Sequence, residues 1–298
     1  MNVTIFGTGA MACLVGAAVA PVASVTLVGT WPKGLAALRT HGIRVEGRPA
    51  GPVRVAALGE AAPPARLALV LVKTWQTATV AAALPGYLAP DGLALTLQNG
   101  LGNVELLGPR ACLGVTTLGA TLLGPGQVRP GGEGVTRMAA PAWVAELLNA
   151  AGLEAAAVAA AQVDGLLWGK LAVNCGINAL TALLRVPNGA LLDRPDAVAL
   201  LNAAAEECAA VAAAQGIALP YADAAGAARA VAQRTAANRS SMFQDILRGA
   251  PTEIEAINGA VARTAERLGQ PAPVNTVLAR LVRAAVATDP QGQCGAAR

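Results

Sequence analysis

The chain has 298 residues, of which 54% are hydrophobic and 13% are charged, and its net charge is +4. This size and composition predict one large domain or two medium ones, with a core built mostly from Ala, Val and Leu. The positive charges are scattered, which argues against a nucleic-acid-binding arm. A single histidine, and five cysteines without a C-x-x-C pair, argue against a zinc site, so no metal is expected.

The cysteines lie in apolar surroundings and are expected to be free thiols in a reducing compartment. The N-terminus enters a predicted strand at Asn2 without the charged and small-residue regions of a secretory signal. One segment, residues 166–184, is long and apolar enough to consider as a membrane span, but it contains Lys170, Asn174 and Asn178. A central lysine costs about 2.5–3.5 kcal/mol on insertion. We therefore expect a cytoplasmic protein in which this segment is a core helix.

Strands and helices alternate through the first half of the chain, which predicts right-handed βαβ units and a parallel sheet. The uninterrupted apolar runs LALVLV and LALTL are typical of strands buried on both faces. The main predicted elements are a strand at 2–6, a helix at 10–20, a strand at 24–28, a helix at 33–41, and strands at 67–72 and 93–97.

From Cys112 to Met138 the pattern changes to short β segments between glycine turns, followed by a helix at 141–152 and a last strand at 153–158. Strand signals nearly vanish beyond Val163. This pattern predicts an α/β domain at residues 1–162 and an all-α domain at residues 163–298, with a disordered tail from Pro290. The helices predicted in the second domain cover 163–184, 195–215, 221–235, 240–248, 252–268 and 273–288.

The segment VTIFGTGAMA fits the G-x-G-x-x-G/A pattern directly after a strand and at the start of a helix. Gly7 permits the tight turn, Gly9 lets the backbone approach a pyrophosphate, and Ala12 occupies the close-packing third position. The alternative is a glycine-rich turn that binds nothing, but the position after the first strand favours a Rossmann-type dinucleotide-binding domain. The predicted phosphate-binding residues are Gly7, Thr8, Gly9, Ala10, Met11 and Ala12.

No carboxylate follows the second strand, where NAD-binding domains hold the ribose hydroxyls. The residues there are Thr30-Trp31-Pro32-Lys33, and no Asp or Glu precedes Glu46. A carboxylate would repel a 2′-phosphate, whereas Thr30 and Lys33 would bind one, so NADPH is the expected cofactor. The alternative for Lys33 is a solvated residue in the first turn of a helix.

Polar residues follow the two buried strands at 67–72 and 93–97. Lys73 comes directly after the first strand, and Gln98-Asn99-Gly100 comes directly after the second. Because ligands of open α/β sheets bind at the carboxyl ends of the strands, we expect Lys73 to meet a phosphate or a substrate carboxylate. Asn99 is expected near the nicotinamide ribose. An ordinary strand-to-loop transition is the alternative for both.

The segment WGKLAVNCGINAL (168–180) carries Lys170, Asn174 and Asn178 on one helix face. Their spacing of four produces a polar stripe about 12 Å long, among positions that are otherwise almost entirely apolar. The alternatives are a solvent-facing side, against which the apolar surroundings argue, and a buried hydrogen-bond network. Buried polar groups need partners, which a ligand in a cleft can also supply, and we favour the ligand. Desolvation would lower the pKa of Lys170 into the range for proton transfer to a ketone undergoing reduction.

A third polar region contains Thr252 and Glu255, which fit a capping box for a helix ending at Gly269. Glu253 would then lie in the first turn, where on spacing alone a carboxylate that complements the helix dipole is the better explanation. The residues that fit caps of the preceding helix are Asn238, Ser240 and Ser241.

Together these motifs resemble the ketopantoate reductase (2-dehydropantoate 2-reductase) family over essentially the whole chain. The lysine-helix segment and TEIEAING (252–259) are the most diagnostic. The resemblance implies a Rossmann domain joined to a helical domain, with NADPH and substrate in the cleft between them. It also implies reduction of the 2-keto group of ketopantoate to D-pantoate, on the route to coenzyme A.

The resemblance further implies that Lys170 is the general acid and oxyanion stabiliser, and that Glu253 binds a substrate hydroxyl and orients Lys170. Ser241 would contact the substrate carboxylate. The other implied substrate-binding residues are Asn174, Asn178 and Asn238, and the implied cofactor-binding residues are Gly7, Gly9, Ala12, Lys73 and Asn99.

Two features depart from the family pattern. Many members place an arginine directly after the second strand, where this chain has Thr30-Trp31-Pro32-Lys33, and many have Gly where this glycine loop has Ala12.

Two alternative functions stay open. One is a reductase of a different branched 2-keto acid. The other is a non-catalytic NADP(H)-binding regulator, against which the presence of both Lys170 and Glu253 argues. The expected partner is the small keto acid, with no nucleic acid or membrane, and a homodimer is left open.

Overall fold

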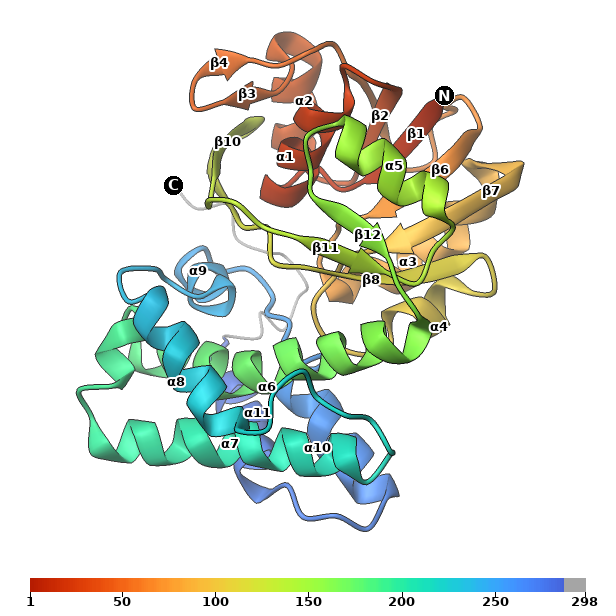
Figure 1. Cartoon of the computed structure of the whole chain (residues 1–298). Coiled ribbons are helices and arrows are strands. Elements are labelled where there is room, and N and C mark those ends of the chain that lie inside the picture. Colours follow the sequence, from red (N-terminus) through yellow and green to blue (C-terminus); the bar gives the residue numbers. More distant parts are fainter. Residues whose placement is uncertain (287–298) are drawn as a thin grey trace. The chain divides into compact units, whose positions relative to one another are not determined.

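The computed structural model describes residues 1–286 (Figure 1). Compact packing divides these residues into two units: unit 1 comprises residues 1–98 and 103–163, and unit 2 comprises residues 99–102 and 164–286. The predicted tail from Pro290, which includes Cys294, lies outside the described residues.

Unit 1 contains an eight-stranded, mostly parallel sheet, as the alternating pattern predicts. Its strands are β1 (Asn2–Phe6), β2 (Ser24–Gly29), β5 (Arg54–Ala57), β6 (Ala65–Val70), β7 (Leu88–Thr96), β8 (Ala111–Thr116), β11 (Thr136–Met138) and β12 (Ala155–Ala157). Their order is β12-β11-β8-β7-β6-β1-β2-β5, and all neighbours are parallel except β8 and β11. Strand β1 lies between β6 and β2 and delivers the glycine loop to the carboxyl edge of the sheet.

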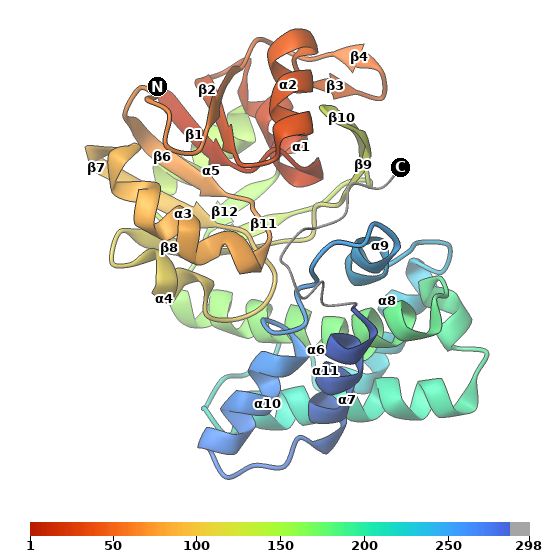
Figure 2. The ribbon, with the colours of Figure 1, turned by 180° about the vertical axis from the view of Figure 1, so that it is seen from behind.

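Helices cover both faces of this sheet. They are α1 (Ala10–Val19), α2 (Pro32–His41), α3 (Thr77–Ala83), α4 (Asn103–Leu107) and α5 (Ala142–Ala150), with short 3-10 turns η1 (Thr74–Gln76) and η2 (Leu84–Gly86). Alternate strand residues point to opposite faces, so one set packs with α1 and α5 and the other with α3 and α4 (Figures 1 and 2). The first set includes Val3, Ile5, Val25, Leu27, Leu67, Leu69 and Leu95, and the second includes Phe6, Val28, Ala68, Val70 and Ala94.

A second, four-stranded sheet in unit 1 joins segments that are distant in the sequence. Its strands are β3 (Arg44–Val45), β4 (Arg48–Pro49), β9 (Ala120–Gly124) and β10 (Gln127–Pro130), in the order β4-β3-β10-β9. The sequence predicts short β segments here but not the pairing of β3 with β10. Val128 of β10 is fully buried in the same hydrophobic cluster as α1, and this burial packs the small sheet against α1.

The bounds of two predicted strands differ from the structure. The strand predicted at 67–72 is β6, which begins at Ala65 and ends at Val70, and the strand predicted at 93–97 is β7, which begins at Leu88. A register shift between Ala65 and Leu67, where β6 pairs with β7, accommodates the Pro-Asp-Gly sequence inside β7. A turn-like sequence is compatible with a strand where the ladder is irregular.

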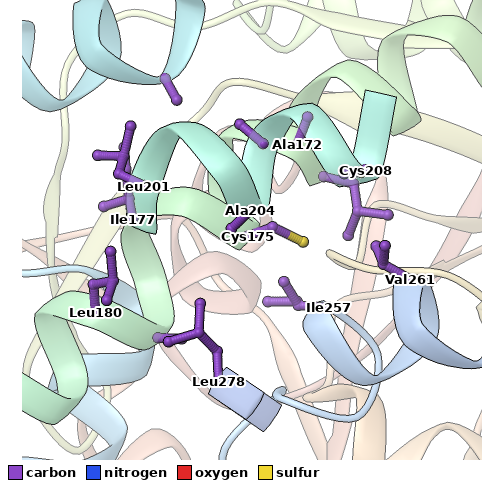
Figure 3. Packing of buried hydrophobic residues seen from close by; sticks show 14 of the residues in the cluster. Ala172, Cys175, Ile177, Leu180, Leu201, Ala204, Cys208, Ile257, Val261 and Leu278 are labelled. Carbon is purple, nitrogen blue, oxygen red and sulfur yellow. The ribbon is translucent and has the colours of Figure 1, made fainter. Parts of the chain in front are cut away.

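Unit 2 is helical, as predicted. Its elements are α6 (Ala160–Leu184), η3 (Asn188–Leu191), α7 (Pro195–Ala213), α8 (Ala224–Arg234), α9 (Ser241–Leu247), α10 (Asn258–Arg267) and α11 (Pro273–Ala285). Figure 3 shows the core: Cys175 and Leu180 of α6 lie among Ala204 of α7, Ile257 before α10, and Leu278 of α11. Small side chains on α6 and α7 allow these helices to pack closely.

Helix α6 is the one helix in the described part of the chain that is long and apolar enough to cross a membrane, and 72% of its most apolar window is buried inside the protein. Its side chains supply the centre of the unit 2 core. The expectation that this segment is a core helix is therefore confirmed.

The helix predicted at 252–268 is shorter than expected. Helix α10 begins at Asn258, and residues 253–257 form turns in front of it. The predicted capping box is wrong, because the Glu255 carboxylate instead pairs with Arg263 and Arg283, each at 2.9 Å. Glu253 consequently does not lie in the first turn of the helix.

Candidate active site

The glycine loop after β1 has the backbone geometry of a tight strand-to-helix turn. Gly7 has a φ of +134°, which side chains rarely tolerate, and its N–H donates to the Val28 carbonyl at 2.8 Å. A Cβ on Gly7 would lie 3.1 Å from the Ala12 Cβ and 3.2 Å from the Leu71 oxygen. The loop therefore requires glycine at position 7 and a small residue at position 12.

The space in front of α1 is open. Gly9 is the N-cap of α1 and has ordinary extended backbone, and a Cβ placed on it would meet nothing within 4 Å. As a glycine, this N-cap residue has no side chain with which to cap the first N–H groups of the helix. Open space beside uncapped helix N–H groups fits a phosphate, which accepts those hydrogen bonds and is favoured by the helix dipole. Thr8, Ala10 and Met11 complete this loop.

The residues predicted to hold a 2′-phosphate differ in their placement. Thr30 accepts a hydrogen bond from Gln76 at 3.0 Å and lines a cavity of about 450 Å³ at the carboxyl end of β2. Lys33 is exposed in the first turn of α2 and does not line this cavity.

A buried amide joins the carboxyl ends of β6 and β7. The Gln98 side chain donates to the Val72 carbonyl and to the Thr77 hydroxyl, both at 2.9 Å, and accepts from Thr96. Lys73 follows Val72 in the sequence, and Asn99 follows Gln98. Gln98 therefore has a structural role, because its hydrogen bonds fix the loops that carry Lys73 and Asn99.

Asn99 belongs to a short loop that packs with unit 2. Residues 99–102 form part of that unit, and the Leu101 N–H donates to the Ala256 carbonyl at 3.0 Å. Gly100 has a φ of +79°, and a Cβ there would lie 2.6 Å from the Ala256 Cβ. This close approach places the Asn99 loop against the turn that follows Glu253.

The polar stripe on α6 has the protected environment that its sequence predicts. Lys170 and Asn174 are half-buried, and Asn178 is only 6% exposed. Leu171 and Cys175, next to them on the helix, are fully buried. The stripe is therefore not a solvated helix face.

Burial lowers the pKa of the Lys170 ammonium from 10.5 to about 8, while the charge of Glu253 acts in the opposite direction. Glu253 is itself only 5% exposed. The structure thus brings together the two residues that the resemblance marks as catalytic, one from α6 and one from the turn before α10. A lysine whose pKa is lowered in this way gives up its proton more readily than an exposed lysine does.

The segment before α9 is fixed to α6 by Ser240. Its hydroxyl accepts from the Phe243 N–H at 3.1 Å, as an N-cap, and from the Thr181 hydroxyl of α6 at 2.7 Å. Of the three predicted cap residues, Ser240 is therefore the cap. Ser241 is the first, half-buried residue of α9, and Asn238 is exposed, with its carbonyl accepting from Asn188.

Sequence reasoning missed a buried network behind the stripe. Asn258, at the start of α10, donates to the Cys175 carbonyl at 3.1 Å and to the Asn275 side chain at 2.9 Å. Glu207 of α7 accepts from the Val274 and Asn275 N–H groups in the first turn of α11. The network ties α7, α10 and α11 to the turn of α6 that carries Asn174. An amide within the apolar sequence of AINGAV was the available signal.

Burial raises the pKa of Cys13 to about 12, and it also raises the pKa of Cys175. These thiols are therefore poor nucleophiles.

Within residues 1–286 no group of three or more His, Cys, Asp or Glu residues is placed to hold a metal ion.

Comparison with known proteins places both units in one family. The family model described as ketopantoate reductase PanE/ApbA matches residues 3–143, and the model for its C-terminal part matches residues 162–286. The chain belongs to the ketopantoate reductase family.

Two relatives with this family's activity in their names are similar over nearly their whole length. The chain is 39% identical to a 2-dehydropantoate 2-reductase of Halobacterium salinarum, over 96% of this chain and 99% of the relative. It is 38% identical to a 2-dehydropantoate 2-reductase of Archaeoglobus fulgidus, over 95% and 97% respectively.

Solved structures support the family fold. A PanE/ApbA family ketopantoate reductase from Ralstonia eutropha has a TM-score of 0.88 at 34% identity, covering 96% of this chain and 98% of that one. A D-mandelate dehydrogenase solved with NADH and anilino(oxo)acetate has a TM-score of 0.90 at 25% identity, with the same coverage. The fold therefore accommodates more than one substrate among its relatives.

Proposed function

We propose that this protein catalyses the NADPH-dependent reduction of ketopantoate to D-pantoate. Membership of the ketopantoate reductase family and two named relatives at 38–39% identity support the reaction class. The observation that carries the mechanism is the lysine of lowered pKa on α6 beside the buried Glu253.

Unit 1 would hold the cofactor, which supplies a hydride when bound. The N–H groups of residues 8–12 at the start of α1 would bind the pyrophosphate, and the open space at Gly9 would admit it. Lys73 and Asn99, at the ends of neighbouring strands, would contact the remainder of the dinucleotide.

Lys170 would act on the ketone oxygen. Reduction at C2 leaves negative charge on that oxygen, and the ammonium both stabilises the charge and donates the proton. Glu253 would hold the ammonium in position and favour its protonated form, because the charge of Glu253 raises the pKa of Lys170. Glu253 would also accept a hydrogen bond from the substrate hydroxyl.

The polar residues around this pair would orient the substrate. Asn174 and Asn178 lie one and two turns along α6 from Lys170 and present amide donors and acceptors on the same face. Ser241, at the first position of α9, would bind the substrate carboxylate, with Asn238 nearby.

The decisive test follows NADPH oxidation by absorbance with ketopantoate as substrate. Saturable turnover is expected in the wild-type protein, with product identified as D-pantoate by chiral chromatography. Cofactor binding without turnover of any 2-keto acid would instead indicate a non-catalytic NADP(H)-binding regulator.

A second candidate is the reduction of a different branched or bulky 2-keto acid. The similarity to D-mandelate dehydrogenase favours it, because that relative has nearly the same fold and was solved with an aryl-substituted oxo acid analogue. A steady-state screen of kcat/KM across 2-keto acids separates the two candidates, since the physiological substrate should have the largest value.

We also propose that the protein acts in the cytoplasm on a free small molecule, as expected for this biosynthetic step. A solved ketopantoate reductase from Staphylococcus aureus is described as dimeric. Size-exclusion chromatography with light scattering would establish whether this chain also forms a homodimer.

A further inference from the structure

The family's usual position for a 2′-phosphate ligand lacks an arginine in this chain, but the tertiary structure brings another arginine to the same end of the sheet. The cavity of about 450 Å³ lies at the carboxyl ends of β2 and β5, where Gly29 and Thr30 face Ala57 and Leu58. One face of α2 closes it. Among the described residues that line this cavity, Arg39 of α2 is the charged one.

We propose that Arg39 binds the 2′-phosphate of NADP(H) in this cavity and thereby sets the cofactor preference of the protein. The inference rests on the proposed function, which supplies the dinucleotide. It names a specificity-determining residue that the sequence pattern at residues 30–33 does not reveal.

The position of the guanidinium is fixed relative to the end of β2. Arg39 Nη2 lies 2.6 Å from Glu60 Oε2, and the same carboxylate oxygen accepts from the Ala57 N–H at 2.7 Å. Ala57 pairs with Gly29 in the sheet, and the Leu58 N–H donates to the Gly29 carbonyl at 2.9 Å. The guanidinium is thus held beside the last residue of β2, where the ribose of a dinucleotide is bound in this fold.

An unpaired carboxylate would repel a phosphate, but the Glu60 carboxylate is paired with Arg39 and accepts from the Ala57 N–H. Arginine has five N–H donors in a planar fork, so it can keep one bond to Glu60 and still bind two phosphate oxygens. The Arg39 and Glu60 side chains are 47% and 52% exposed, which leaves the guanidinium accessible to a ligand. Glu60 is in this view a positioning residue that ties Arg39 to the strand end.

Lys33 is the competing candidate, and helix geometry argues against it. Pro32, Ala36 and Arg39 are spaced three or four residues apart and share the face of α2 that lines the cavity. Lys33 is displaced about 100° around the helix from Pro32 and does not line the cavity. Both residues are exposed on one helix, so substituting either should leave the fold intact.

Binding measurements by isothermal titration calorimetry test the proposal without relying on turnover. The wild-type protein, Arg39→Ala and Lys33→Ala are each titrated with NADP⁺ and with NAD⁺. For Arg39→Ala we expect the Kd of NADP⁺ to rise about 10- to 100-fold and that of NAD⁺ to change less than about twofold. Lys33→Ala should change either Kd by less than about threefold.

The adenosine half of the cofactor gives an independent readout. Adenosine 2′,5′-bisphosphate should lose affinity for Arg39→Ala, while 5′-AMP should not. Arg39→Lys should restore only part of the affinity, because a lysine cannot form the bidentate contact. Circular dichroism melting of each variant verifies that the fold is retained.

The outcomes separate this inference from the proposed function. Equal losses of NADP⁺ and NAD⁺ affinity in Arg39→Ala, no loss at all, or the full loss in Lys33→Ala would each overturn the role of Arg39. Those results would leave the reductase proposal standing if the wild-type protein binds NADP⁺ and turns over. A wild-type protein that binds neither dinucleotide would overturn both.

Discussion

In the proposed function, the glycine loop of unit 1 and the polar stripe of unit 2 would present different atoms to a ligand. The loop offers backbone N–H groups, and its side chains matter mainly through their small size, as the contacts of Gly7 with Ala12 and Leu71 show. The stripe offers side chains, and its chemistry depends on the ionisation of Lys170, which burial and Glu253 control. Added atoms in the loop should therefore weaken phosphate binding, whereas a changed functional group in the stripe should weaken catalysis.

Replacing Lys170 should have the largest effect. Lys170→Ala removes the proposed proton donor and oxyanion partner, so kcat should fall by about 10²- to 10⁴-fold. Cofactor affinity should persist, because the glycine loop is in unit 1. Steady-state NADPH oxidation and calorimetric cofactor titration measure the two properties separately. The matched control is Lys33→Ala, an exposed lysine on α2, and unchanged kcat in Lys170→Ala would remove this residue from the mechanism.

Substitutions of Gly7 and Gly9 test whether the backbone of the glycine loop binds the cofactor. Gly9→Ala has space for its Cβ and ordinary backbone, so thermal stability should be retained while cofactor Kd rises about 10- to 100-fold, because the methyl group stands where a phosphate approaches. Gly7→Ala should lower stability as well, by about 1–3 kcal/mol, because its φ is +134°. Paired calorimetric titrations and denaturant unfolding give both values, and unaltered cofactor affinity in Gly9→Ala would contradict the phosphate assignment.

The pH dependence of kcat/KM tests the role of the Lys170 side chain in the polar stripe. Burial lowers the pKa of Lys170 to about 8, and its protonated form is the proposed general acid. The value of kcat/KM should therefore fall about tenfold per pH unit above that pKa. Glu253→Gln removes the charge that raises this pKa, so the break should move to lower pH. The profile is measured with the cofactor saturating at every pH, and a break that stays in place in Glu253→Gln would rule out this coupling.

The buried Asn258 network should contribute more to the free energy of unfolding than the exposed ion pairs of Glu255 do. Asn258→Ala deprives the Cys175 carbonyl and the Asn275 side chain of their donor, so unfolding free energy should fall by about 1–3 kcal/mol. Glu255→Ala breaks two exposed ion pairs, with Arg263 and Arg283, and should cost less than about 1 kcal/mol. Denaturant unfolding followed by circular dichroism measures both, and equal losses would show that the buried amide is not structurally important.

The sequence by itself determined the fold class, the parallel sheet, the glycine loop and the helical second unit, because each depends on local periodicity or on glycine spacing. Helix α2 illustrates this: the segment predicted from Lys33 to His41 is helical from Pro32 to His41. The family resemblance similarly depended on short motifs that remain contiguous in the chain, and the family models confirm it.

Tertiary structure decided the features that join distant residues. Spacing alone placed Glu253 in a helix, but Glu255 is drawn to Arg263 and Arg283, and Glu253 instead lies buried in the turn before α10. The pairing of β3 with β10 and the Asn258 network likewise join segments far apart in the chain. Arg39 belongs to the same class: in the sequence it is a charged residue near a helix end, and only the packing of α2 against β5 places it beside Gly29. Local sequence encodes backbone preference, whereas the partner of a buried or charged side chain is selected by the free energy of the whole folded chain.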